Sequence, residues 1–161
     1  MHRDPPQASC LVRCRTGFTL IEMLAVMALL GVLTGIALPR LNDLLVTTKV
    51  TQAIADINAI EQDVMAFQAT SDSLPGSLTA IGRGGMLDPW GNPYQYLVTS
   101  GQGKNPQGAR KDRSLHPLNS DFDLYSMGAD GASVQPITAK PSQDDIIRAN
   151  DGGYIGLARN Y

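Results

Sequence analysis

Residues 18–38 form an almost unbroken apolar run, which constrains the chain more than any other feature. Sixteen of its 21 residues are hydrophobic, and Glu22 is its one charged residue. A helix of about 20 apolar residues spans the roughly 30 Å hydrocarbon thickness of a bilayer. A cleaved secretory signal has a shorter apolar region and ends at a small-residue site, which the Ala37-Leu38-Pro39 sequence does not match. The run has too few polar residues for a solvent-facing side, and we therefore expect a membrane-inserted helix.

The helical pattern continues beyond Pro39. Apolar residues recur at three- and four-residue spacings, which predicts an amphipathic helix with one broad apolar stripe. The stripe consists of Val50, Ala53, Ile54, Ile57, Ile60, Val64 and Phe67. We expect one helix from residue 18 to about residue 70, roughly 80 Å long at the usual rise per residue. Pro39 is expected to kink this helix between its apolar half, residues 18–38, and its amphipathic half, residues 39–70.

The composition changes after Thr70, because 13 of the 16 glycines and seven of the 10 prolines lie beyond it. Frequent turn signals separate three short strand candidates at residues 94–98, 121–127 and 154–158. A small sheet is marginal without a partner face, and the apolar stripe supplies one. The sequence therefore predicts an α+β fold, in which residues 71–161 form a small antiparallel sheet packed on the long helix.

Charge and cysteine content exclude several function classes. The net charge of −2 is the sum of +2 in residues 1–17 and −4 in residues 18–161, which argues against a dedicated nucleic-acid binder. Both cysteines, Cys10 and Cys14, lie in the first 17 residues. The rest of the chain has a single histidine, His116, and no nucleophile motif beside it. We expect neither a zinc site nor an enzyme.

Glu22 is the most informative single residue, because a carboxylate in the bilayer costs about 2.5–3.5 kcal/mol. No Lys or Arg lies within residues 18–38 to pair with it. Cleavage after Gly17 would create a new cation, the α-amino group of Phe18, one helical turn from Glu22. That amine could pair with Glu22 of the same chain or of a neighbouring helix.

The Gly17-to-Glu22 sequence GFTLIE, followed by the apolar helix, resembles the start of class III prepilins. These are the subunits of type IV pili and of type II secretion pseudopili. The resemblance implies cleavage after Gly17 by a prepilin peptidase and N-methylation of Phe18. It also implies that Glu22 aids subunit docking and that Pro39 is the helix-kinking proline of a type IV pilin-like fold.

Two stretches of residues 71–161, which we call the head, resemble the major pseudopilins of type II secretion. They are DPWGNPY at residues 88–94 and DLYSMGADG at residues 123–131. In the first stretch, Pro89 and Pro93 fix φ and Gly91 permits a positive φ, so a tight loop is expected before the strand. The aromatic residues Trp90, Tyr94 and Tyr96 are predicted to pack rather than to bind a ligand.

The same resemblance implies a calcium ion beside the second head stretch. Asp130 occupies the matching position, and Asp144 and Asp145 could complete the site with further oxygen ligands. Residues 132–151 depart from the family pattern, and an Asp145–Arg148 pair at helical spacing could stabilise that loop instead.

The basic residues between Lys104 and Arg113 are expected to form a solvated loop, with a contact to a neighbouring acidic head or a membrane surface as the alternative.

Together these features predict a structural filament subunit with a 17-residue leader. The resemblance implies a single-pass protein of the bacterial inner membrane, with a cytoplasmic leader and a periplasmic head, which polymerises into a periplasmic filament. Its expected partners are other copies of itself, membrane lipid, minor pseudopilins, prepilin peptidase, an inner-membrane platform protein and an assembly ATPase. The alternatives are a pilin-like subunit of a surface filament for adhesion, motility or DNA uptake, and a membrane-anchored calcium-binding or enzymatic domain.

Overall fold

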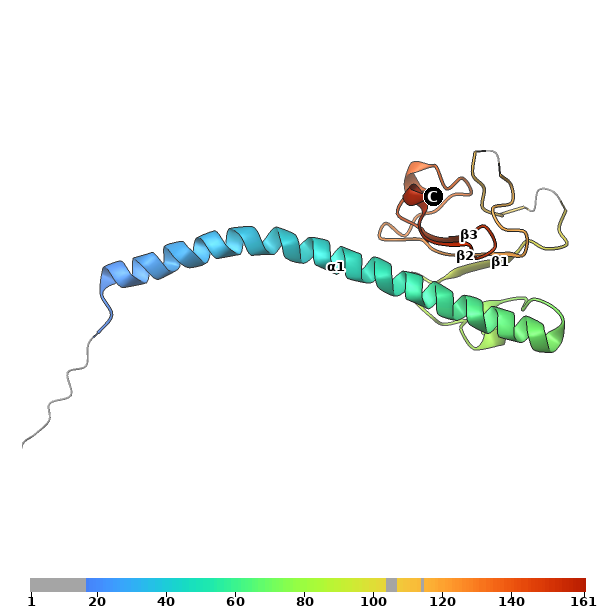
Figure 1. Ribbon diagram of the computed structural model, residues 1–161, viewed down its shortest axis with the longest axis horizontal. Coiled ribbons are helices and arrows are strands. Elements are labelled where there is room, and N and C mark those ends of the chain that lie inside the picture. The colour runs from blue at the N-terminus through green and yellow to red at the C-terminus, as the bar shows by residue number, and fades with distance from the viewer. Residues whose placement is uncertain (1–16, 104–106, 114) are drawn as a thin grey trace, which may run out of the picture. The chain divides into compact units, whose positions relative to one another are not determined.

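The computed structural model describes residues 17–103, 107–113 and 115–161. The chain divides into two compact units, residues 1–42 and residues 43–161. One helix, α1 (Leu20–Ser71), contributes to both units (Figure 1). The expected leader, apart from Gly17, lies outside the described residues, as do Cys10, Cys14 and Lys104.

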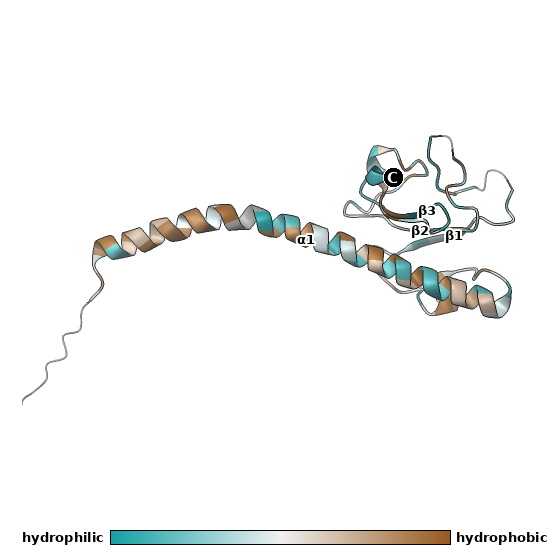
Figure 2. Cartoon of the chain, viewed as in Figure 1, coloured by the Kyte–Doolittle hydropathy of each residue, from teal (hydrophilic) through white to brown (hydrophobic). Residues whose placement is uncertain are grey.

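In the first unit, Figure 2 shows the first half of α1 mostly in the colour of hydrophobic residues, with a hydrophilic segment near its start. Every described side chain from Phe18 to Ile36 is exposed. The helix is long and apolar enough to cross a membrane. It continues through Pro39 without a break in its assignment, so a single long helix is confirmed. The kink at Pro39 stays a prediction.

The second unit contains a four-stranded antiparallel sheet in the order β1-β2-β3-β4. Its strands are β1 (Gln95–Val98), β2 (Phe122–Ser126), β3 (Ile146–Ala149) and β4 (Tyr154–Leu157). Three short 3-10 helices, Leu78–Ile81, Lys140–Ser142 and Ala158–Asn160, lie in the connections. The α+β fold with a small antiparallel sheet is confirmed.

Strand β3 was absent from the sequence prediction, which placed residues 144–148 in a loop. All four of its residues are buried. Ile146 packs in the core cluster that contains the helix stripe, whereas Ile147 packs in a second cluster on the other face of the sheet. Because both faces of the strand are covered, its sequence lacks the apolar–polar alternation that marks a half-exposed strand.

The main core joins α1 to the sheet. Four members of the apolar stripe, Ala53, Ile57, Ile60 and Val64, have no exposed surface. They pack in one cluster with Phe122, Leu124 and Ile146 of the sheet and with Tyr94 and Leu78 of the connections. Trp90 and Tyr96 pack against this cluster, which confirms the structural role expected for the aromatic residues. The amphipathic half of α1 and the head therefore form one compact unit.

Polar contacts also fasten the connections to α1. The Tyr94 hydroxyl donates a hydrogen bond to Asp56 at 2.9 Å, and burial together with this bond raises the pKa of Tyr94 above its usual range. The Arg83 Nε donates to the Asp63 carboxylate at 2.8 Å. These two bonds tie positions two turns apart on α1 to segments that precede the sheet.

Arg148 of β3 is the largest fully buried side chain. Its guanidinium pairs with Glu61 of α1 at 2.7 Å and with Asp121 at 2.8 Å. The same group donates to the Phe122 carbonyl and lies 4.0 Å from the centre of the Phe122 ring. The expected Asp145–Arg148 pair is therefore wrong, because β3 is extended and Arg148 faces α1 while Asp145 pairs elsewhere.

Truncation of the stripe should expose how much the head depends on α1. We expect Ile57→Ala to lower the free energy of unfolding by about 2–5 kcal/mol, because it leaves a cavity in the core. The measurement is urea denaturation of the detergent-solubilised full chain, followed through the fluorescence of Trp90, its one tryptophan. Met65→Ala, at an exposed position of the same helix, should change the free energy of unfolding far less. Equal losses for both variants would contradict this assignment of the core.

Candidate processing and assembly site, and the head loops

The candidate processing site lies immediately before α1. Gly17, Phe18 and Thr19 adopt no regular secondary structure and are exposed, and the helix begins at Leu20. A protease needs an accessible, non-helical peptide bond, and the bond between Gly17 and Phe18 meets both conditions. The sequence prediction of the cleavage position is therefore compatible with the local backbone.

Glu22 and Thr19 form a reciprocal cap at the start of α1. The Glu22 amide donates to the Thr19 hydroxyl at 3.3 Å, and the Thr19 amide donates to the Glu22 carboxylate at 3.4 Å. This is the capping-box arrangement, which satisfies amides that have no partner within the helix. The carboxylate also lies at the positive end of the helix dipole, which favours its charge.

The cap was missed by the sequence analysis, although its signal is present. The Thr-x-x-Glu spacing at positions 19 and 22 is the usual signature of a capping box. The predicted partner of Glu22, the α-amino group of Phe18, exists only after cleavage. Within the described part of the uncleaved chain, Glu22 has the Thr19 amide and no salt bridge.

In the head, Asp88 organises the loop formed by the first of the two head stretches, residues 88–94. Its carboxylate accepts the amides of Trp90 at 3.0 Å and Asn92 at 2.8 Å, and its other oxygen accepts the Ser126 hydroxyl at 2.5 Å. The Asn92 side-chain amide donates to the Gly128 carbonyl at 3.0 Å. The two head stretches singled out in the sequence are thus bonded to each other, through polar residues that the sequence analysis had not assigned.

The turn after β2 is held by Asp144. One of its carboxylate oxygens accepts the amides of Ala129 at 2.9 Å and Asp130 at 3.2 Å. The Asp130 carboxylate accepts the amide of Ala132 at 2.8 Å, within its own turn. Successive amides that converge on one oxygen form a site for an anion, which Asp144 itself fills.

Asp145 is buried and pairs with Arg110 rather than with the other two aspartates. The Arg110 guanidinium donates to the Asp145 carboxylate at 2.5 Å and to the Val134 carbonyl at 2.8 Å, and it also contacts the Ser133 hydroxyl. Burial raises the pKa of the Asp145 carboxyl, while the bonds from Ser133 and Arg110 oppose that rise. Arg110 is itself almost fully buried, so its placement in a solvated loop is wrong.

The three aspartates singled out for calcium therefore do not fit a calcium site as they are arranged. Calcium takes six to eight oxygen ligands. Asp144 accepts two main-chain amides on one oxygen, Asp130 accepts an amide of its own turn and Asp145 pairs with a guanidinium. Across the described ranges, no group of three or more acidic, histidine or cysteine side chains could hold a metal ion.

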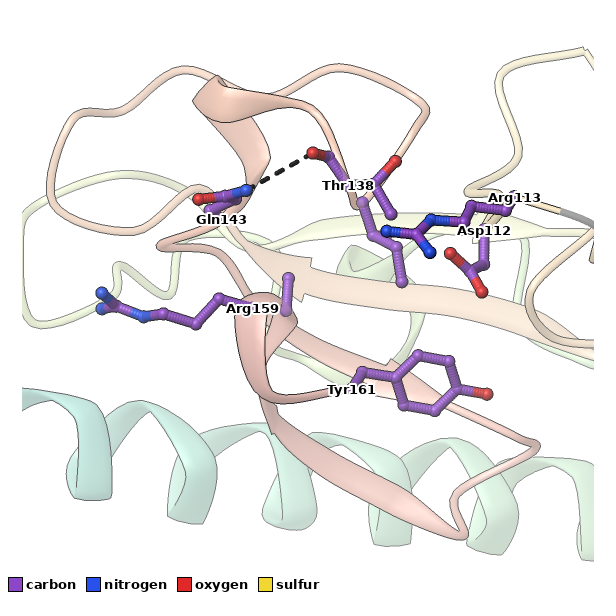
Figure 3. A pocket seen from close by; sticks show the side chains of 8 residues that line it. Asp112, Arg113, Thr138, Gln143, Arg159 and Tyr161 are labelled. Carbon is purple, nitrogen blue, oxygen red and sulfur yellow. Dashed lines mark hydrogen bonds between the residues drawn. The ribbon is translucent and has the colours of Figure 1, made fainter.

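A polar pocket of about 320 Å³ lies beside the C-terminus (Figure 3). Its polar lining includes Arg113, Arg159 and Tyr161, and the Gln143 side chain donates to the Thr138 carbonyl at 3.4 Å. The lining residues in the described part of the chain include no cysteine or histidine that could act as a nucleophile or base.

Comparison with known proteins gives consistent results for the N-terminal motif and for most of the chain length. Residues 12–38 match the family model described as the prokaryotic N-terminal methylation motif. The chain is 33% identical to the type II secretion system core protein G of Pseudomonas aeruginosa over 140 residues, covering 74% of this chain and 87% of that protein. The core protein G of Vibrio cholerae is 28% identical over 74% of this chain and 84% of its own length. This chain belongs to the pilin and pseudopilin family.

The chain is also similar to fimbrial proteins. A fimbrial protein of Neisseria meningitidis is 33% identical over 140 residues, which cover 83% of this chain and 82% of that protein. No solved structure gives a significant match to the chain. The pilin and pseudopilin family consists of structural subunits, and the helix, sheet and N-terminal motif described above are the features that this chain shares with it.

The Asp88 bonds can be tested by truncation. Asp88→Ala should lower the free energy of unfolding by about 2–4 kcal/mol, because it leaves two amides and a buried hydroxyl without their acceptor. The measurement is urea denaturation of the full chain in detergent. Asp130→Ala, which removes one exposed bond from a neighbouring turn, should cost less than about 1 kcal/mol. If the two substitutions cost the same, Asp88 does not hold the loop.

Proposed function

We propose that this protein is the major pseudopilin of a type II protein secretion system, which polymerises from the inner membrane into a periplasmic filament. The observation that carries the proposal is the pairing of an N-terminal methylation motif with an apolar-all-round helix, on a chain that aligns with core protein G along most of its length. The proposed role is structural, without catalytic activity of its own.

The first half of α1 suits both states that a filament subunit must occupy. Before assembly its all-round apolar surface is stable in lipid. In a filament the same surface would pack against equivalent helices of neighbouring subunits. Both surroundings are apolar, so the transfer gains little hydrophobic free energy, and close packing at small residues such as Gly31 and Gly35 must supply specificity. A Cβ added at either glycine would meet no group beyond its own stretch of helix within 4 Å, so both leave room for a neighbour.

Glu22 would then set the position of each new subunit. Cleavage after Gly17 leaves an α-amino group on Phe18, which carries a positive charge at neutral pH. A carboxylate in apolar surroundings gains most from a charged partner, and the amine of a neighbouring subunit could supply it. The pairing fixes the axial stagger of two otherwise featureless apolar helices.

The proposed partners follow from this assembly route. A prepilin peptidase cleaves the leader and methylates Phe18. Minor pseudopilins and a platform protein in the inner membrane act with the major subunit. A separate assembly ATPase drives extraction, because the chain itself offers no nucleotide-binding motif. The head would lie in the periplasm and the leader in the cytoplasm.

A surface filament is the second candidate, and the similarity to the Neisseria fimbrial protein favours it. Such a filament would serve adhesion, motility or DNA uptake. The absence of cysteine after Cys14 favours the secretion role, because many pilins close their C-terminal region with a disulfide.

Deletion of the gene separates the two candidates. We expect the deletion to block export of folded proteins across the outer membrane, so that they accumulate in the periplasm, while surface filaments and twitching persist. The measurement is the distribution of a secreted enzyme between medium and periplasm, with complementation by the wild-type gene as control. Normal secretion combined with loss of a surface filament would refute the secretion role.

Glu22→Ala tests the docking role. Processing should continue, because the Gly17–Phe18 bond is unchanged, whereas filament assembly should fall to a small fraction of the wild-type amount. Cleavage of the leader is measured from the shift in electrophoretic mobility of the chain, and assembly is measured from the amount of sheared or cross-linked filament. Asp43→Ala removes an exposed carboxylate from the same helix outside residues 18–38 and serves as the control. Normal filaments in Glu22→Ala cells would disprove the pairing with the Phe18 amine.

A further inference from the structure

We infer that the head of this protein is held together by an internal cation, the guanidinium of Arg110, and that it neither needs nor binds calcium for its stability. The inference concerns the head alone and is independent of which filament the chain builds. The sequence implies a calcium site at Asp130, Asp144 and Asp145, but these three carboxylates are bonded to amides and to a guanidinium.

The oxygen atoms around Arg110 are the kinds that a calcium ion would bind. They are a carboxylate from Asp145, a main-chain carbonyl from Val134 and a hydroxyl from Ser133. The Ser133 hydroxyl also donates to the Asp145 carboxylate at 2.6 Å, which closes a ring of three groups. A guanidinium supplies five N–H donors in a fixed plane, so one side chain can hold several oxygens at once.

Arg110 also connects segments that are distant in sequence. Its main-chain amide donates to the buried carboxylate of Asp123 in β2 at 2.6 Å. Its guanidinium lies 4.2 Å from the centre of the Tyr125 ring in the same strand. Together with Ser133, Val134 and Asp145, these contacts join the connection before β2, the strand itself, the long loop after it and the residue before β3. A metal ion in a loop-rich head would have the same task.

The Arg110 and Asp145 side chains compensate each other's charge. The Arg110 and Asp145 side chains are 3% and 0% exposed. Two atoms of the pair, Arg110 Nε and Asp145 Oδ1, are buried without a hydrogen-bond partner, and each belongs to a group whose charge the other compensates. A divalent cation added at Asp145 would meet the guanidinium at close range, and like charges in a buried site repel strongly.

The remaining acidic positions nearby do not provide a second place for the ion. The amides of Ala129 and Asp130 point at the Asp144 carboxylate, so their positive ends face the space that a cation would need. Gly128 supports this arrangement, because its φ of +66° is left-handed and a side chain there would collide with the Asp144 carbonyl. The turn therefore closes around Asp144 itself.

The first experiment measures calcium directly on the wild-type full chain in detergent. The melting temperature of the head, read from the fluorescence of Trp90, should agree to within about 1 °C between millimolar calcium and excess EGTA. Calorimetric titration with calcium chloride should show no saturable binding. A melting temperature that rises by several degrees with calcium, or a one-to-one binding isotherm, would overturn the inference.

The second experiment removes the internal cation. Arg110→Gln should lower the melting temperature by about 10 °C or more, because Asp145 is left as a buried charge without its partner. Added calcium should not restore it. Arg159→Gln, which removes an exposed guanidinium from the same head, is the matched control and should shift the melting temperature by about 2 °C or less. Equal shifts in the two variants would show that Arg110 is not the stabilising cation.

A double variant separates the ion pair from simple packing. Arg110→Gln combined with Asp145→Asn should melt above Arg110→Gln alone, because Asp145 is then no longer a buried charge without its partner. Recovery supports the charge role of Arg110. A double variant that melts below both single variants would point to packing as the cause and would contradict the inference. If Arg110→Gln does not fold, the wild-type calcium experiment and the Asp145→Asn variant decide the question.

Discussion

The contact between the apolar stripe of α1 and the four-stranded sheet is the one on which the rest of the head depends. A small sheet of short strands has too little apolar area to be stable alone. Ile57, Ile60 and Val64 supply the missing face, and Phe122 and Ile146 fill the space opposite. Arg148 of β3 adds a buried guanidinium that joins Glu61 of α1 to Asp121, the residue before β2, so β3 contributes both apolar and ionic contacts to the helix.

This contact divides one continuous helix between two kinds of surroundings. The half before Pro39 is apolar on all sides and its described side chains are exposed, whereas the half from Asp43 onward buries one stripe in the head. The first half therefore depends on lipid or on other subunits, and the second half depends on its own chain. In the proposed filament, such a subunit could fold its head before assembly, because the apolar half before Pro39 contributes no described side chain to the head core.

The sequence predicted the parts of the structure that follow a regular pattern. The 3.6-residue period located the helix and its buried stripe, and strands β1, β2 and β4 were found within a few residues of their ends. Strand β3 could not be found in this way, because a strand covered on both faces has no alternation. Polar contacts were the hardest to predict. Asp145 and Arg148 are three residues apart, but the backbone there is extended, and the two side chains pair with Arg110 and Glu61 respectively. Only the pairing of distant segments decides such partners, whereas the Thr19–Glu22 cap was readable from local spacing and was overlooked.

That cap has a consequence for the order of events in assembly. The bonds between Thr19 and Glu22 give the carboxylate and the first free amides a partner while the helix is still alone. In the proposed assembly route, docking would then exchange one set of bonds for another, and the carboxylate would not start as a bare charge in lipid. A subunit placed at the wrong stagger could then leave again, because its carboxylate would return to the Thr19 amide and not to an unpartnered state.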